Sequence, residues 1–383
     1  MKFTLLIKRI FKSIALLPSV IALIFLILGI GINLIEYDYS QIEFLKALLI
    51  EDREKIQHIL AYVIGGIFTL TIFSFTMVMN VINSNINLFS PRLVPLLLSE
   101  QHHKIVLGFT TGTIVYAMVL SIRASGYEEG YFSGIATALA VCFAITCVFL
   151  YIYFLHHISI SIHINFILHK SFSRTQKNIE KYKALTSDFG LKRDMIECRY
   201  EILSGHCGYI QMHKVEECLE LIEKLDTNVV FVKYPGEFVL ENDVILKSSK
   251  ELSADNIKEL IKHIPIDKDV PMNVVETGFK HLVEVAVKAS SPAINDPGTA
   301  LSAIHYLTQL FIKRHFVSQE GVFSANEKHL LGSSILSNKM LFKICYQEMI
   351  NYMTNDPVLV RALKHSSDKI NHHTTTGDYI VPS

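Results

Sequence analysis

A long stretch without a formal charge, residues 59–91, constrains this chain more than any other feature of its sequence. It reads ILAYVIGGIFTLTIFSFTMVMNVINSNINLFSP and contains no Asp, Glu, Lys or Arg. A helix of roughly 20 predominantly apolar residues is long enough to cross a hydrocarbon core roughly 30 Å thick. The stretch therefore predicts a membrane protein with a transmembrane helix at about residues 59–82.

Five polar residues recur along this stretch and interrupt its apolar character. They are Thr69, Thr76, Asn80, Asn83 and Asn87, separated by seven, four, three and four residues. This spacing places all five on one face of a helix, where lipid is an unfavourable neighbour. The face is expected either to line a water-tolerant path through the membrane or to pack against another helix, with Gly65 and Gly66 permitting close approach.

Three other apolar stretches have the length of a membrane span, at about residues 14–35, 105–125 and 132–162. Together the four spans predict a transmembrane domain over residues 1–164. Basic residues precede the first span and follow the last, whereas the loop of residues 36–57 has three basic and six acidic residues. Because Lys and Arg favour the cytosolic side, we expect a multi-pass protein of the bacterial inner membrane with both termini in the cytosol.

From about residue 165 the composition becomes that of a soluble protein. We expect a helical stalk (165–192), a small β-rich domain (193–250) and a helical domain (251–383). The predicted fold class is an α-helical polytopic membrane protein, with four transmembrane helices followed by a cytosolic α+β region. Strands are expected at residues 199–203, 208–212, 229–233 and 237–246, around a helix at 215–225. Further helices are expected at residues 254–263, 271–289, 297–314, 325–333, 337–354 and 357–370.

The β-rich segment from Pro235 to Val244 has the rhythm of barrel-sandwich-hybrid domains, in which a Gly and a hydrophobic pair precede a short turn. Carrier domains of that kind hold a modified Lys between two Met residues, and this segment has no such Lys. We therefore expect a structural or assembly role for this β unit, with no lipoyl, biotinyl or other cofactor.

Three segments together carry a resemblance to a known family: SNINLFSPRL (84–93), GYIQ followed by PGEFVLENDVIL (208–211 and 235–246), and SPAINDPGTAL (291–301). They resemble the predicted bacterial membrane proteins of the DUF2254 family. The resemblance implies the same order along most of the chain, four spans and then a cytosolic region, but it implies no activity. Gly298 departs from the family pattern, in which a bulkier residue is expected.

Two short motifs are candidate functional sites. Ser90, Pro91 and Arg92 follow the polar stretch. Arg92 is expected to bind lipid headgroups, to lie at the cytosolic mouth of a pore, or to pair with a carboxylate of the soluble domain. The other motif comprises Ser291, Pro292, Asn295, Asp296, Pro297 and Thr299. It is expected to form a helix–turn–helix corner with Asp296 as cap and Pro297 at the first helical position, or else a ligand or subunit contact.

Other chemistry has little support in the sequence. Histidines gather near the predicted inner face of the membrane, where they suit interfacial anchoring, pH-responsive charge or, least well, a metal site: His102, His103, His156, His157, His163 and His169. No phosphate-binding loop, H-E-x-x-H or G-x-S-x-G motif is present, so we expect neither an enzyme nor a bound metal. A formal net charge of zero gives no indication of nucleic-acid binding. Six cysteines without a C-x-x-C pair predict free thiols.

These features favour a homo-oligomeric inner-membrane channel or channel-like protein, with the polar helix lining the path and the cytosolic region assembling or gating it. Several copies are needed because four helices with thinly polar faces make a poor pore alone. The partners would be the lipid bilayer, other copies of the chain, and ions. The alternative is a membrane-anchored scaffold or sensor, in which the spans only tether and oligomerise the cytosolic domain.

Overall fold

A computed structural model of the chain describes residues 16–32, 52–88, 101–126, 134–161, 164–186, 196–212, 214–271, 273–318, 320–324 and 329–381. The chain divides into two compact units. The first unit comprises Met1–Asn87 and Pro91–His163, and the second comprises Leu88–Ser90 and Ile164–Ser383.

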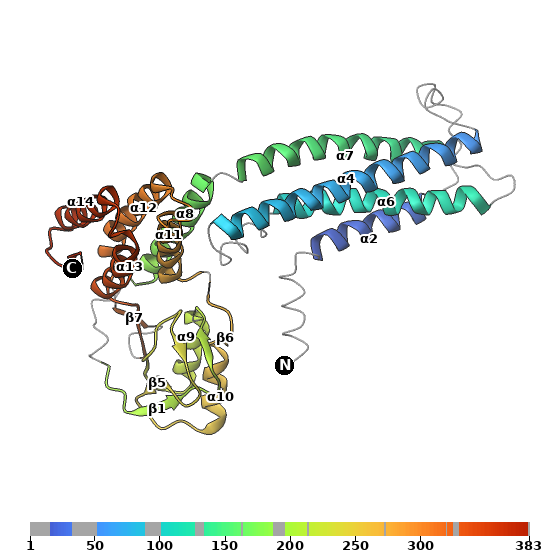
Figure 1. The fold of residues 1–383 in the computed structure, drawn as a ribbon. Helices are drawn as coiled ribbons and strands as arrows, with labels where there is room; N and C mark the ends of the chain where they lie inside the picture. The colour runs from blue at the N-terminus through green and yellow to red at the C-terminus, as the bar shows by residue number, and fades with distance from the viewer. Residues whose placement is uncertain are drawn as a thin grey trace. The chain divides into compact units, whose positions relative to one another are not determined.

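The described part of the first unit consists of long helices that lie side by side (Figure 1). They are α2 (Leu16–Gly31), α4 (Arg53–Leu88), α6 (Gln101–Gly126) and α7 (Gly134–Ser161). The Gln57 side chain donates to the Ala124 carbonyl at 3.1 Å, while Ile67 packs with Ile114, so α4 runs antiparallel to α6. The Tyr116 hydroxyl donates to the Ala136 carbonyl at 3.1 Å, which ties α7 to α6.

Three of these helices are long and apolar enough to cross a membrane, over Glu54–Val81, His102–Ala124 and Ile135–Ser159. The described part of α2 has 16 residues and, at about 1.5 Å per residue, is shorter than the hydrocarbon core. The predicted first span therefore remains a prediction. Helix α4 extends to Leu88, beyond the predicted end of its membrane span at about residue 82.

Glycines allow α2 and α6 to pack at short distance. A Cβ atom at Gly108 would lie 2.8 Å from the Ile21 side chain, and one at Gly112 would lie 2.8 Å from the Phe25 ring. These two glycines are four residues apart and therefore share one face of α6. Gly65 and Gly66, which the sequence suggested for close packing, have nothing within 4 Å of such an atom. The close helix contact of this unit is thus made by α2 and α6.

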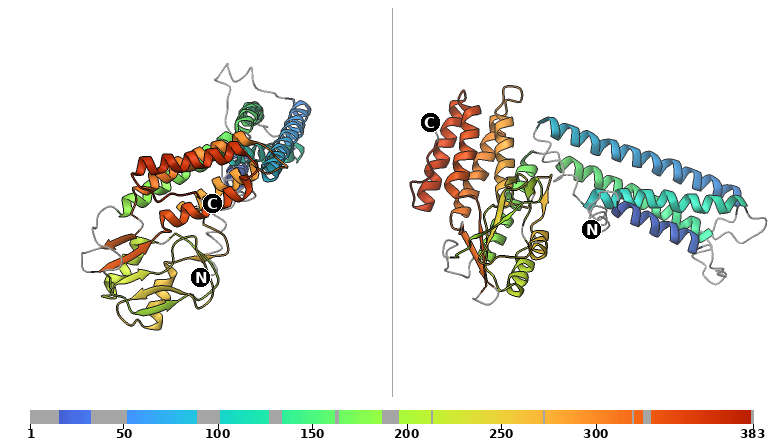
Figure 2. Two further views of the ribbon diagram at one scale, coloured as in Figure 1. Left: turned by 60° about the vertical axis from the view of Figure 1, so that its left-hand side comes forward. Right: turned by 90° about the horizontal axis from the view of Figure 1, so that it is seen from below.

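The second unit begins with α8 and continues into two small sheets with associated helices (Figures 1 and 2). Its elements up to residue 267 are α8 (Ile164–Thr186), β1 (Tyr200–Leu203), β2 (Gly208–Ile210), α9 (Val215–Lys224), β3 (Val229–Phe231), β4 (Phe238–Val239), β5 (Val244–Ser248), α10 (Ala254–Lys262) and β6 (Ile266–Asp267). The smaller sheet has the order β4-β2-β6. Cys218 and Ile222 from α9 and Leu260 from α10 are buried in one core with the strands.

A hairpin that the sequence did not predict completes the larger sheet. Its strands are β7 (Glu320–Ser324) and β8 (Leu330–Ser334), and the sheet order is β1-β5-β3-β8-β7. The helix expected at residues 325–333 is therefore wrong, and the region after residue 251 is not all helical. A short apolar run such as Leu330–Leu331 fits a helix or a strand by periodicity alone. Its parallel pairing with β3, about 100 residues earlier, is decided only in the folded chain.

The remaining helices form a bundle with α8. They are α11 (Val275–Ala289), α12 (Pro297–His315), α13 (Asn338–Met353) and α14 (Pro357–Thr374), close to their predicted positions. Helix α8, which covers most of the predicted stalk, packs on α11 and α12. A Cβ atom at Gly278 of α11 would overlap the buried Thr175 side chain of α8. The two helices therefore approach each other as closely as a glycine permits.

Replacing Gly112 by Leu should destabilise the first unit, because the new side chain must displace Phe25. Overpacking of this kind costs about 1–3 kcal/mol. Denaturant titration of the protein in detergent should give a lower unfolding midpoint for Gly112→Leu. The control is Gly66→Leu, where the added side chain meets open space. Equal midpoints for the two variants would contradict the α2–α6 packing.

Candidate functional site

The polar stripe of α4 lies on the face that is turned away from the other described helices of the first unit. Ile67 and Ser74 are buried, whereas Thr69, Thr76, Asn80 and Asn83 are exposed. Ile67 and Thr76 are nine residues apart, which is two and a half helical turns, so they face opposite directions. The stripe therefore does not pack against another helix within the described part of this chain.

The hydroxyl groups and the amide groups of the stripe differ in how they are satisfied. Thr69 donates to the Gly65 carbonyl at 2.8 Å and Thr76 to the Ile72 carbonyl at 2.9 Å. The side-chain amides of Asn80 and Asn83 make no hydrogen bond within the part of the chain that the structure describes. These two amides need a partner from outside, which water or another copy of the chain can supply.

The residues at the predicted cytosolic end of the stripe lie partly or wholly outside the described residues. The backbone of Asn87 belongs to α4, but its side chain lies outside the described residues. Ser90, Pro91 and Arg92 also lie outside the described residues. The stripe that the structure places therefore consists of Thr69, Thr76, Asn80 and Asn83.

Aromatic and imidazole rings cluster between the start of α6 and the end of α7. The Tyr153 hydroxyl and His102 Nδ1 are 3.0 Å apart, and the ring centroids of His102 and His157 are 4.9 Å apart. The centroids of His103 and His157 are 5.6 Å apart. The structure thus brings together three of the six histidines that the sequence grouped.

The remaining histidines and the cysteines form no comparable site within the described residues. His156 is exposed on α7, His169 lies on α8 in the second unit, and His163 is outside the described residues. Within the described ranges, no group of three His, Cys, Asp or Glu residues is arranged to hold a metal ion. All six cysteines are free, and burial raises the pKa of Cys218 and Cys345 to about 12, which keeps these thiols protonated at neutral pH.

Residues 291–297 form the predicted helix–turn–helix corner between α11 and α12. Asn295 has a φ of 49°, in the left-handed region that Asn tolerates. Asp296 is the N-cap of α12, where its carboxylate accepts from the Thr299 N–H at 3.1 Å and from the Thr299 hydroxyl at 2.5 Å. Pro297 occupies the first turn, where its missing N–H is not needed. Local hydrogen bonding therefore accounts for the order of residues in this motif.

The corner also presents a small surface. Pro292, Asn295 and Pro297 are exposed, while Ser291 is half-buried and donates to the Lys288 carbonyl at 2.7 Å. Gly298 is exposed, and a Cβ atom there would make an ordinary contact with Asp296 at 3.5 Å. The departure from the family pattern at Gly298 therefore leaves the packing of the corner intact.

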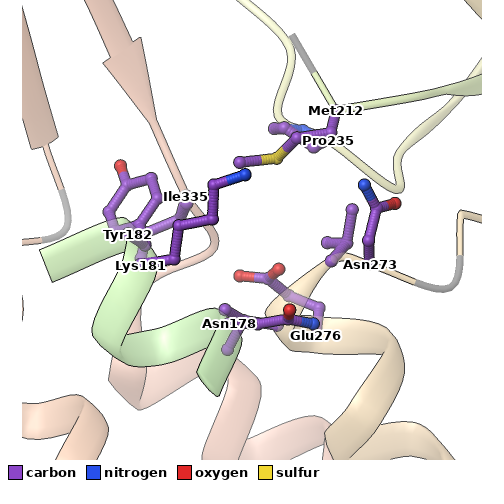
Figure 3. A pocket seen from close by; sticks show the side chains of 10 residues that line it. Asn178, Lys181, Tyr182, Met212, Pro235, Asn273, Glu276 and Ile335 are labelled. Carbon is purple, nitrogen blue, oxygen red and sulfur yellow. The ribbon is translucent and has the colours of Figure 1, made fainter. Parts of the chain in front are cut away.

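A cavity of about 60 Å³ lies in the second unit, where α8, the start of α11 and the loops after β2, β3 and β8 meet (Figure 3). Its apolar wall consists of Met212, Pro235, Val274, Val275 and Ile335. Its polar lining consists of Asn178, Lys181, Tyr182, Asn273 and Glu276. Apolar walls with a few converging polar groups are typical of small-molecule sites.

Glu276, which lines this cavity, forms a buried ion pair with Arg314. Arg314 of α12 is 1% exposed, and its Nη2 donates to Glu276 Oε1 at 2.8 Å and to the Leu336 carbonyl at 2.5 Å. Nη1 donates to the side-chain oxygen of Asn338. The pair therefore joins α11, α12 and the loop before α13 through groups that are excluded from water.

The negative charge of Glu276 affects the pKa of two tyrosines near the cavity. Burial raises the pKa of the Tyr182 hydroxyl, and the negative charge of Glu276 raises it further. The pKa of Tyr234 is raised by burial and, to a smaller extent, by Glu237 and Glu276. Both hydroxyls therefore stay protonated at neutral pH, and they are hydrogen-bond donors rather than bases.

Sequence reasoning did not identify Glu276, Lys181, Asn178 or Arg314 as site residues. The one available signal was an Arg within an apolar helical pattern, Leu310–Phe311 followed by Arg314. A buried Arg requires a buried acid, but the sequence offers many acids and does not indicate which one.

Comparisons with known proteins identify a family and uncharacterised relatives that resemble this chain. A family model described as "Predicted membrane protein (DUF2254)" matches residues 12–367. "Uncharacterized protein Rv1290c" of Mycobacterium tuberculosis is 24% identical over 262 residues, which are 64% of this chain and 48% of the relative. "Uncharacterized protein Mb1321c" of Mycobacterium bovis matches with the same values. The chain spans about half the length of these curated relatives. No solved structure matches it.

Glu276→Gln should strongly destabilise the second unit, because it leaves the buried guanidinium of Arg314 without a counter-charge. Breaking a buried pair in this way costs about 3–5 kcal/mol. Denaturant unfolding of the purified chain measures the change. The matched control is Glu259→Gln on the exposed face of α10, which should leave the midpoint unchanged. Equal effects of the two substitutions would show that the pair is not needed for stability.

Asp296 should make the stability of the corner depend on pH. Hydrogen bonds from the hydroxyl and N–H of Thr299 lower the pKa of this carboxyl below its ordinary value of 3.8. A lowered pKa in the folded state stabilises the fold above the unfolded pKa, and the contribution is lost as pH falls through the folded pKa. Asp296→Asn retains a good cap without a titrating group. The difference in unfolding free energy between the two chains should therefore shrink below about pH 4, whereas a difference that is constant from neutral to acid pH would contradict this account.

Proposed function

The chain belongs to the DUF2254 family of predicted membrane proteins, and we propose that it is a homo-oligomeric inner-membrane channel or channel-like protein in which α4 lines the path. In this proposal both termini are cytosolic, and the second unit assembles or gates the membrane part. The partners are the lipid bilayer, other copies of the chain and ions, without a nucleic acid, a cofactor or a catalytic reaction.

The observation that carries the proposal is the outward direction of the polar stripe. Thr69, Thr76, Asn80 and Asn83 face away from the helices on which α4 packs, since the opposite side of α4 buries Ile67 and Ser74. If one copy were the functional form, this face would lie in lipid. A ring of several copies would instead turn the stripes toward a common axis.

The free-energy cost of an unsatisfied amide in hydrocarbon favours such an arrangement. An unsatisfied amide in hydrocarbon costs several kcal/mol, on the order of 4–8 in the least polar media. Thr69 and Thr76 reduce this cost by bonding to their own helix, but Asn80 and Asn83 make no such bond among the described residues. Water in a path along the stripe would satisfy both amides.

The path would carry little fixed charge of its own. Between residues 59 and 88, α4 contains no Asp, Glu, Lys or Arg, so its lining would present hydroxyl and amide dipoles only. Such a lining tolerates water and small ions without a charged ring that would select their sign. The proposal therefore assigns no ion selectivity to the path.

A second candidate function, a membrane-anchored scaffold or sensor, is favoured by the glycines of α4. Gly65 lies on the same face as Thr69, and at both Gly65 and Gly66 an added Cβ atom would have no other atom within 4 Å among the described residues. A second copy of α4 could therefore approach closely at this point. In that case the amides of Asn80 and Asn83 would bond across a dry helix contact.

Cysteine labelling separates the two functions. In a chain whose six native cysteines are replaced, Asn80→Cys should react with a water-soluble maleimide in intact membranes, because the channel exposes this position to water. Phe75→Cys is the lipid-facing control and should not react, because Phe75 is exposed about a third of a turn away from the stripe. Reconstituted bilayers should also show conductance, and Asn80→Leu or Asn83→Leu should change it several-fold, while Phe75→Leu should leave it unchanged.

Each alternative outcome has a definite meaning. One outcome is that the protein shows no conductance, that Asn80→Cys is not labelled, and that this cysteine cross-links between copies under oxidising conditions. That outcome would contradict the channel and support the scaffold. Absence of conductance, labelling and cross-linking would contradict both functions, because the stripe would then face lipid in a single copy.

A further inference from the structure

A basic stripe runs along one side of α8. It consists of four residues separated by four, three and four positions: Lys170, Arg174, Lys177 and Lys181. In a helix with 3.6 residues per turn, these positions fall within about 60° of one another and extend over roughly 17 Å. Lys177 and Lys181 are exposed, and Lys170 and Arg174 are half-buried. The stripe therefore forms one continuous positive strip on the surface of the second unit.

The stripe faces away from the side of α8 that holds the second unit together. Thr175, Ile179 and Tyr182 are buried where α8 packs on α11 and α12 (Figure 1). Ile179 is two positions from Lys177 and from Lys181, which corresponds to a rotation of about 160° around the helix. The charges of the stripe can therefore be removed without opening the core of the bundle.

The charges of the stripe are not neutralised by the second unit. Arg174, Lys177 and Lys181 form no ion pair among the residues that the structure describes. Lys247 and Lys250, which lie on and beside the larger sheet, each pair with a carboxylate. Basic groups without a counter-charge, gathered on one side of a helix, attract an anionic surface.

The rest of the second unit gives this attraction a direction. Helix α8 has five basic residues and one acidic residue, a net charge of +4. The sheet region, residues 196–269, has nine basic and fifteen acidic residues, a net charge of −6. An anionic surface therefore attracts α8 and repels the sheet region.

The covalent structure keeps the stripe near a membrane. Helix α7, a candidate membrane span, ends at Ser161, and α8 begins at Ile164. Three chain steps reach at most about 11 Å, even when the backbone is fully extended. A surface that is tethered so close to its partner needs little intrinsic affinity to remain bound.

We propose that the basic stripe of α8 binds the headgroup phosphates of anionic phospholipids in the membrane that carries the chain. Lys and Arg clusters next to a membrane span bind anionic lipid surfaces, with a gain in affinity of about fivefold for each basic residue. Phe166 lies one turn before Lys170, and the Lys170 ammonium is 5.7 Å from the centre of its ring. An aromatic ring at this end of the stripe suits the headgroup layer. The proposal does not depend on whether α4 lines a path.

Fluorescence quenching of the full chain in lipid vesicles tests this surface. In a chain whose six native cysteines are replaced, Ser173→Cys places a fluorophore beside the stripe. The vesicles contain phosphatidylcholine, part of it with a nitroxide quencher on its headgroup. Replacing about a third of the lipid by phosphatidylglycerol should increase quenching about twofold or more, because the anionic surface draws α8 toward the headgroups. High salt should reverse the increase.

Neutralising the stripe should abolish the effect of phosphatidylglycerol. The combined change Arg174→Gln, Lys177→Gln and Lys181→Gln removes three charges and should lower the affinity for the anionic surface about a hundredfold. The increase in quenching should then disappear. Lys177→Glu, a single exposed change, should reduce the increase even if the triple variant does not fold.

The matched control removes the same charge from another part of the bundle. Lys339→Gln, Lys343→Gln and Lys364→Gln change exposed residues of α13 and α14 and should leave the increase intact. Quenching that does not respond to phosphatidylglycerol, or an equal loss in the two triple variants, would overturn the proposal. Binding of a single-stranded RNA oligonucleotide through the stripe, without a response to phosphatidylglycerol, would overturn it in favour of a nucleic-acid partner. None of these measurements depends on conductance, so their outcome is separate from that of the channel.

Discussion

Hydrocarbon offers no hydrogen-bond partners, and the first unit depends on this constraint throughout. Most of its polar side chains are satisfied locally: Thr113 donates to the Phe109 carbonyl at 2.9 Å, and Tyr116 ties α6 to α7. Thr69 and Thr76 do the same on α4. Against this background the amides of Asn80 and Asn83, which have no partner in the described chain, are exposed groups that require another molecule. Water and a second copy are the two candidates, and they separate the channel from the scaffold.

Helix α2 packs closely on α6, and α4 presents a broad outward face. Gly108 and Gly112 allow α2 to approach α6 closely, with Phe25 packed against Phe109 and Phe143. Helix α4 contacts α6 and α7 along a single side, through residues such as Leu60 and Ile67. The opposite side is therefore available to whatever surrounds a single copy, and it is the side that carries the polar stripe.

In the second unit a different constraint operates, because a buried guanidinium must be neutralised. Arg314 meets this need through Glu276, and the same carboxylate contributes to the cavity. One oxygen of Glu276 thus stabilises the helical bundle, while the other is directed at the cavity.

The sequence by itself determined the properties that depend on neighbours along the chain. The apolar stretches, the cap at Asp296 and most helices after residue 253 follow from local composition and turn chemistry. The resemblance to the DUF2254 family, drawn from three short segments, is confirmed by the match over residues 12–367. Tertiary structure alone decided that the stripe of α4 faces outward, that β8 pairs with β3, and that Lys181 and Glu276 share a cavity. Each of these depends on contacts between residues that are far apart in the chain, and the side that a helix buries is set by the volume and shape of its partners, which periodicity does not encode.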